Sequence, residues 1–185
     1  MRRRAVLLWL PFLALAAACG GGGGGGGSPT EPTPTPTPTP PGITLTADSA
    51  PTQNALVVAT GAGTTVDTLV LEVRATNVQD LYGVGFDLTY PNSLLRFEGA
   101  TPGFLNQGQQ VSFNLVETSP GTLVVGYARL GAVPGASGSG VVLTLRFTAT
   151  AAGTGRLAFA QNAAFNSRGE PLGLTWVGGS LSIVR

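Results

Sequence analysis

The sequence predicts an all-β protein, a sandwich of about nine strands with jelly-roll topology that follows a disordered tether. Only 10% of the residues are charged, and 28 glycines and 14 prolines supply the breaks that many short strands need. Apolar and polar residues alternate with a period of two along several segments, and no convincing amphipathic helix is found. A chain of 185 residues has room for one such domain.

Residues 1–18 have the pattern of an export signal. Three arginines at positions 2–4 precede an apolar stretch at 5–15, and alanines at 16–18 lead directly into Cys19. The apolar stretch is too short to span a bilayer comfortably. A lone reactive thiol on an exported chain is a liability, so lipidation is the interpretation that gives Cys19 a role.

The residues before Cys19 resemble the lipobox of bacterial lipoproteins, in which the cysteine carries the lipid and becomes the new N-terminus. This resemblance implies a membrane partner through a lipid anchor. Gly20, where some lipoproteins have aspartate, implies the outer membrane, facing the periplasm or the cell surface. Ala16 departs from the usual leucine. Ordinary secretion, with Cys19 left as a free thiol, is the alternative.

Residues 19–42 read as a linker. The eight glycines at 20–27 cannot repay the entropy of ordering, which predicts a flexible coil. The Thr-Pro repeats within 28–41 favour polyproline II, whose rise of about 3.1 Å per residue gives a reach of roughly 40 Å. The linker therefore predicts a stalk that presents the domain away from a membrane.

Residues 43–185 are predicted to form the single folded domain. Its strands are expected at residues 43–47, 55–60, 66–76, 81–90, 111–115, 123–130, 141–150, 156–160 and 172–184. Turn residues separate them at 61–63, 91–92, 119–121, 134–135, 138–140, 153–155 and 168–169. The nearly continuous apolar run at 123–130 predicts burial on both faces. The last segment is expected to break into two strands at Gly178-Gly179.

The segment 81–90 shows the alternation most clearly. One face carries large apolar side chains and is predicted to be core: Tyr82, Val84, Phe86, Leu88 and Tyr90. The opposite face is flat and polar, and is a candidate partner-binding surface: Gly83, Gly85, Asp87 and Thr89. A face of this kind can instead simply contact water.

Four stretches, in this order, resemble the cohesin domain. The first is Leu81–Phe97, a strand ending in Tyr90 and followed by Pro91-Asn92 and an apolar pair. The second is the Gly-x-Gly-led strand Gly138–Phe147, and residues 153–160 and 165–170 are similar to the late strand and turn of the family. The likeness covers residues 43–185 and implies a jelly-roll sandwich of the kind that cohesins share with carbohydrate-binding modules.

In cellulosomes, cohesins bind dockerin modules and so mount enzymes on scaffolds, which implies a protein partner. The dockerin-facing strand of the family commonly carries Asn and Asp shortly before its tyrosine. Aligned on Tyr90, those two positions are Gly83 and Gly85, which have no side chain to offer. The resemblance therefore supports the fold but not the usual dockerin contacts. Asp87 is the nearest polar group on that face, and lies two residues along the strand.

The residue inventory argues against catalysis. There is no histidine and the single cysteine lies near the N-terminus, so the common triads and zinc sites cannot be built. Carboxylates that could hydrolyse glycosides are spread singly along the domain: Asp67, Glu72, Asp80, Asp87, Glu98, Glu117 and Glu170. No segment resembles an EF-hand loop. The sequence predicts no enzyme, no cofactor and no metal.

The charge excludes nucleic acid as a partner. All ten basic residues are arginines, and loss of residues 1–18 would leave seven of them against nine carboxylates, a net charge of −2. A slightly acidic domain with scattered charges lacks the basic surface that phosphates require.

The leading hypothesis is a non-catalytic, surface-displayed binding or adaptor module with a protein partner. The first alternative is polysaccharide binding, with Phe104, Tyr127 and Trp176 as platforms that stack on sugar rings; the opposing interpretation places these three rings in the core or in turns. The second alternative is a structural envelope lipoprotein without a discrete ligand.

Overall fold

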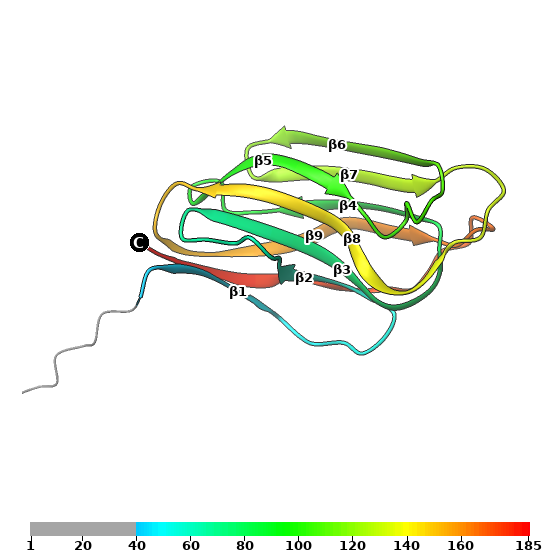
Figure 1. Cartoon of the computed structure of the whole chain (residues 1–185), viewed down its shortest axis with the longest axis horizontal. Coiled ribbons are helices and arrows are strands. Elements are labelled where there is room, and N and C mark those ends of the chain that lie inside the picture. Colours follow the sequence, from blue (N-terminus) through cyan, green and yellow to red (C-terminus); the bar gives the residue numbers. More distant parts are fainter. Residues whose placement is uncertain (1–39) are drawn as a thin grey trace, which may run out of the picture. The chain divides into compact units, whose positions relative to one another are not determined.

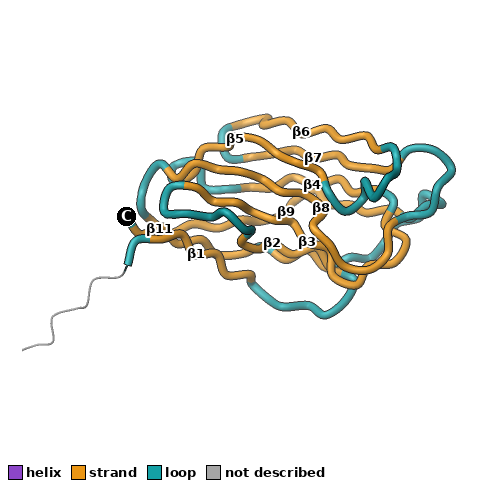
Figure 2. Tube along the Cα trace, in the orientation of Figure 1, coloured by secondary structure: helices purple, strands orange, loops and turns teal. Residues whose placement is uncertain are grey.

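The computed structural model describes residues 40–185, which form two β-sheets packed face to face (Figure 1, Figure 2). The strands are β1 (Gly42–Ala47), β2 (Ala55–Thr60), β3 (Thr68–Leu81), β4 (Gly83–Thr89), β5 (Leu95–Pro102), β6 (Val111–Ser119), β7 (Thr122–Arg129), β8 (Ala136–Ala149), β9 (Gly153–Phe165), β10 (Thr175–Val177) and β11 (Gly179–Val184). Within these residues no helix has the length and apolar character needed to cross a membrane. The signal peptide, Cys19 and the linker up to residue 39 lie outside the described residues.

The six-stranded sheet has the order β1-β11-β9-β4-β7-β6, and the five-stranded sheet the order β10-β2-β3-β8-β5. All neighbours are antiparallel except β10 and β2. The chain crosses between the sheets several times, and one of these crossings is at Tyr82, between β3 and β4. Strand β4 is thereby placed inside the six-stranded sheet, with β9 on one side and β7 on the other (Figure 1).

The core lies between the sheets and is built from alternate residues of each strand. Strand β4 contributes Val84, Phe86 and Leu88, none more than 5% exposed. The Phe86 ring meets Phe159 edge to face at 5.2 Å and Trp176 at 5.6 Å between centroids. Burial of each large apolar side chain stabilises the fold by about 1.5–3 kcal/mol, so the alternation determines which side of β4 faces outward.

The predicted all-β sandwich is confirmed, with eleven strands in place of about nine. The break predicted in 172–184 is present, because Gly178 separates β10 from β11. Strand β5 was missing from the predicted set. Its pairing with β8 shifts register between Phe97 and Gly99, and such a bulge interrupts the period of two by which a strand is recognised.

Three local predictions were wrong. Residues 123–130 are not buried on both faces, because Val124 is 37% exposed on the outer side of β7. The turns predicted at 138–140 and 153–155 lie within β8 and β9. Glycine there serves close packing: a Cβ on Gly140 would lie 2.4 Å from the Phe104 ring, and one on Gly155 would lie 2.6 Å from Pro91.

Asp80, near the end of β3, holds two loops together: the one before β8 and the one after β9. Its carboxylate accepts hydrogen bonds from the amide of Gly135 (2.7 Å) and from the hydroxyl and amide of Ser167 (2.8 and 3.2 Å). These hydrogen bonds hold the pKa of Asp80 below its usual value. The bond from the Ser167 hydroxyl has the largest effect, and the bond from the Gly135 amide the next largest. These bonds fasten the segment that follows β9 beside the start of β4.

Candidate functional site

The outer surface of strands β9, β4, β7 and β6 is built from aligned rows of small side chains. Register pairs Gly85 of β4 with Gly126 of β7 and Ala163 of β9, and pairs Asp87 with Val124 and Ala160. Figure 1 shows the four strands side by side. We call this surface the small-residue face; its members are Ala158, Ala160, Ala163 and Phe165 of β9, Gly83, Gly85, Asp87 and Thr89 of β4, Thr122, Val124, Gly126 and Ala128 of β7, and Ser112, Asn114 and Val116 of β6.

The small-residue face is mainly apolar where it is exposed, with Ser112 and Asn114 as its exposed polar members. The five large apolar side chains most exposed in the described part of the chain include three of its members: Val116 at 48%, Phe165 at 42% and Val124 at 37%. Asp87 is the one ionisable member of the face. Exposed apolar side chains are ordinary singly, but their concentration on one face is typical of an interaction surface.

The centre of this face is hollowed. The hollow has a volume of about 330 Å³ and is lined by Gly83, Gly85, Gly126, Ala128 and their neighbours. Phe165 borders it on the β9 side, and Ser112 and Asn114 border it on the β6 side. The hollow exists because four adjacent positions have either no side chain or a single methyl group.

The four residues predicted as a partner-binding strip do lie on one outward side of β4. Gly85, Asp87 and Thr89 are half-buried and Gly83 is buried. Sequence reasoning on one strand missed the contributions of β6, β7 and β9, because the neighbours of β4 come from distant parts of the chain. Gly126 could have indicated that β7 contributes to this surface, since an isolated glycine inside an apolar strand often marks a close approach of another group.

The aromatic residues proposed for sugar stacking are packed into the fold. Phe104 is 8% exposed and Tyr127 is 2% exposed, so these two are not surface platforms, and the opposing interpretation that places them in the core is confirmed. The Tyr127 hydroxyl donates to the carbonyl of Gly103 at 3.2 Å. Trp176 is half-buried against Phe159, at 5.3 Å between centroids, and against Phe86. Burial of Phe104 and Tyr127 leaves no row of exposed aromatic rings among these three residues.

The carboxylates of the domain are dispersed, and most have a structural partner. Ion pairs join Glu72 to Arg74 (2.5 Å), Glu98 to Arg96 (2.9 Å), Asp48 to Arg156 (2.6 Å), Glu170 to Arg168 (2.8 Å), and Asp67 to Arg185. Glu117 accepts the Tyr90 hydroxyl. In residues 40–185 no three acidic or other metal-ligating side chains are grouped to hold a metal ion.

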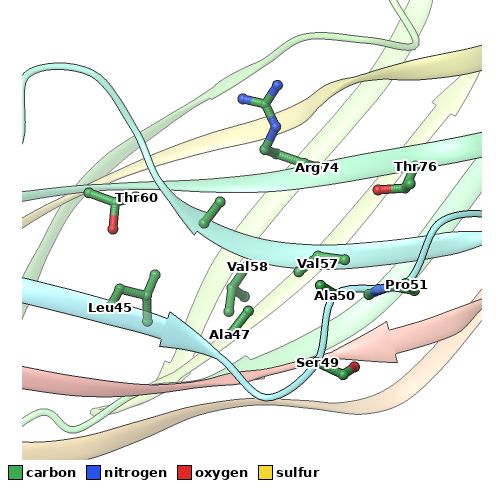
Figure 3. Close-up of a pocket in the computed structure, with 11 residues that line it drawn as sticks. Leu45, Ala47, Ser49, Ala50, Pro51, Val57, Val58, Thr60, Arg74 and Thr76 are labelled. Carbon is green, nitrogen blue, oxygen red and sulfur yellow. The ribbon is translucent and has the colours of Figure 1, made fainter. Parts of the chain in front are cut away.

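A separate groove of about 350 Å³ lies between β1 and β2, where β10 covers only the first half of β2. Its lining is mainly aliphatic, with Leu45, Ala47, Val57 and Val58 around it (Figure 3). Arg74 extends away from Leu45 and Ala47 in this view (Figure 3) and pairs with Glu72. The polar side chains of its lining are those of Ser49, Thr60, Thr76 and Arg74.

Comparison with protein families finds one match: the model of the cohesin domain fits residues 55–170. No curated protein matches the chain.

Solved structures with the same architecture include several cohesins. The sixth cohesin of scaffoldin B of Acetivibrio cellulolyticus, solved in complex with a dockerin, is 20% identical with a TM-score of 0.58, over 70% of this chain and 97% of that one. A type I cohesin–dockerin complex of Clostridium thermocellum matches at 18% identity and a TM-score of 0.58, over 70% and 98%. A non-cellulosomal cohesin of the archaeon Archaeoglobus fulgidus matches at 20% identity and a TM-score of 0.55, over 78% and 92%. At sequence identities of 18–20%, the similarity to these structures is evidence for the fold alone.

Proposed function

The chain belongs to the cohesin family, and from this premise we propose that its sandwich is a non-catalytic module that binds a protein partner through the small-residue face. Solved relatives include cohesins in complex with dockerins. The choice of this face as the binding surface is supported by its side chains. Val116, Val124 and Phe165 are exposed around a central area of glycine and alanine, and Asp87 is its one charged member.

The outer face of the five-stranded sheet has a different character. Its outward positions carry charged side chains, among them Glu72, Arg74, Arg96, Glu98 and Arg146. Such side chains keep their hydration in the free protein and lose it in an interface, and charged residues are depleted from interface cores. The small-residue face is therefore the better docking surface of the two. With Phe104 and Tyr127 buried, polysaccharide binding is not favoured.

The partner contacts are proposed to differ from those of the usual dockerin pair. Gly83 and Gly85 stand where the family commonly has side chains that form hydrogen bonds. The polar side chains that the small-residue face offers to a partner are those of Asp87 and Thr89 on β4, Thr122 on β7, and Ser112 and Asn114 on β6. We expect a partner that gains more from apolar contact than from hydrogen bonding.

Replacement of Val124 by aspartate tests the proposal. The change places a second carboxylate beside Asp87 on a surface that must lose water on binding, and we expect the affinity for a captured partner to fall about 30- to 100-fold. The partner would be captured from envelope and secreted fractions with the immobilised full chain, and its affinity measured by surface plasmon resonance.

The matched control is Val66→Asp, because Val66 is 44% exposed but lies outside the small-residue face. This variant should bind like the unchanged protein, and both variants should give the same circular dichroism spectrum. Equal loss in both variants, or none in Val124→Asp, would refute the assignment of the face.

We also propose that the module is exported and held at the outer membrane by a lipid on Cys19. The support comes from the sequence alone: the arginines, the apolar stretch and the alanines before Cys19. Cells fed an alkyne analogue of palmitate should label the unchanged chain, and Cys19→Ala should abolish the label and move the protein to the soluble fraction. A labelled Cys19→Ala variant, or an unlabelled unchanged chain, would exclude the anchor.

A further inference from the structure

Gly85 and Gly126 face each other directly on β4 and β7, in the middle of the small-residue face. Glycine inside a strand is unfavourable, because it loses more backbone freedom on folding than other residues and provides no side chain for packing. Two glycines at one cross-strand pair therefore need a physical reason.

The fold supplies such a reason for other glycines in the described residues. Gly121 has a φ of 94°, which side chains rarely tolerate. A Cβ on Gly103 would lie 2.3 Å from the carbonyl oxygen of Val141, and one on Gly83 would lie 3.1 Å from the Cβ of Ala128. These positions are glycine because the backbone or a neighbour requires it.

The fold supplies no reason for the Gly85–Gly126 pair. A Cβ on Gly126 would meet nothing within 4 Å, and a Cβ on Gly85 would meet only the carbonyl oxygen of Val125, at 3.9 Å. Neither glycine has a positive φ. What glycine does achieve at both positions is to keep the hollow of about 330 Å³ open. A cavity of roughly 150 Å³ is enough to hold a benzene-sized group, so the hollow has room for a large side chain.

The negative charge of Asp87, beside the hollow, restricts which partner groups can bind next to it. Asp87 lies two residues from Gly85 on the same side of β4, which places it about 7 Å along the strand. It is the one charged member of the small-residue face. A carboxylate that is covered by a partner without receiving a cation or a donor would lose its hydration uncompensated.

We propose that the Gly85–Gly126 pair forms a socket for one large apolar side chain of the protein partner, and that Asp87 pairs with an arginine or lysine of the same partner segment. This inference rests on the proposed function and specifies its partner. Side chains three or four residues apart on a helix, or two apart on a strand, have the spacing that the socket and Asp87 require.

Filling the socket should stabilise the protein and prevent binding. Valine at Gly126 has room in the free protein and suits a strand, so Gly126→Val should raise the melting temperature by about 2–4 °C. A lower melting temperature would show that the fold needs the glycine, and would overturn the inference. Gly42→Val is the matched control, because a Cβ there also meets nothing within 4 Å and Gly42 lies on β1, away from the socket.

Binding is tested with a phage-displayed library of random 16-residue peptides selected on the full chain. Clones that bind the small-residue face are those that lose binding to Val124→Asp. We expect these clones to share a large apolar residue and an arginine or lysine at the stated spacing. They should bind Gly126→Val and Asp87→Asn at least tenfold more weakly, and Gly42→Val without change.

The outcomes separate the two proposals. Clones that are sensitive to Val124→Asp but bind Gly126→Val as well as the unchanged chain would overturn the socket and leave the binding face in place. Clones insensitive to Asp87→Asn would overturn the cationic contact. A selection in which no clone responds to Val124→Asp would overturn the binding face, and the socket with it.

Discussion

Replacement of Arg129 by methionine should lower the free energy of unfolding by about 3 kcal/mol. Arg129 is only 5% exposed. Its guanidinium donates to the carbonyl oxygens of Leu105 (2.8 Å) and Pro134 (2.6 Å) and to the side-chain oxygen of Gln107 (3.1 Å). Methionine keeps much of the apolar stem but leaves these acceptors without a donor in a site poorly reached by water, and an unsatisfied buried polar group costs about 1–3 kcal/mol.

Urea unfolding followed by circular dichroism measures this loss. Arg129→Lys should be intermediate, because a single ammonium cannot reach three acceptors that a planar guanidinium spans. Gln107→Ala removes one acceptor and should cost no more than about 1 kcal/mol. A methionine variant as stable as Gln107→Ala would mean that the loop carbonyls find other donors.

Arg129 is also informative about function. It lies on the inner side of β7, opposite the small-residue face, and holds the loop after β5 to the loop before β8. At a temperature where the methionine variant is folded, its affinity for the partner should equal that of the unchanged protein. A structural arginine and a binding face on the same strand can thus be separated by experiment.

Raising the pH from 10 to 12 should destabilise the domain by about 2 kcal/mol through Tyr90. Tyr90 is 7% exposed, and its hydroxyl donates to the carboxylate of Glu117. Burial first, and then Glu117, raise the pKa of Tyr90 to about 12 from the usual 10. Above pH 10 the unfolded chain releases this proton while the folded chain keeps it. The stabilisation is therefore complete below pH 10 and is lost as the pH rises through 12.

Tyr90→Phe provides the control. At pH 7 it should cost about 1 kcal/mol for the lost hydrogen bond, but it cannot ionise, so the two stability curves should cross near pH 11. Burial also raises the pKa of Tyr127, so some alkaline dependence should remain in the variant. The chain has neither lysine nor histidine, which keeps the interval clear of those groups. Parallel curves for the two proteins would contradict the assignment to Tyr90.

The period of two in the sequence was enough to predict the fold class and the inner and outer sides of β4. Val84, Phe86 and Leu88 are buried, while Gly85, Asp87 and Thr89 are not. The prediction worked because successive side chains of a strand must point to opposite sides, and only one of these two sets is apolar.

The same pattern could not decide what lies opposite a given side chain. Tyr127 was a candidate sugar platform until the sheet order placed it inward, with its ring edge to face against Phe113 at 5.6 Å. Strand β5 escaped prediction because its bulge breaks the alternation. Both failures have one cause: burial depends on which strands become neighbours, and strand neighbours are distant in the chain.

The amino-acid sequence alone was enough to predict the sandwich, its cohesin-like order of motifs and the small number of potentially catalytic groups, because these follow from residue types and local periodicity. The small-residue face, which we propose as the binding surface, could be seen only in the tertiary structure. The tertiary structure brings Gly85 opposite Gly126, some forty residues away, and sets Val116, Val124 and Phe165 on the same surface. A face is a property of register between strands, and register is set by the packing of the whole core.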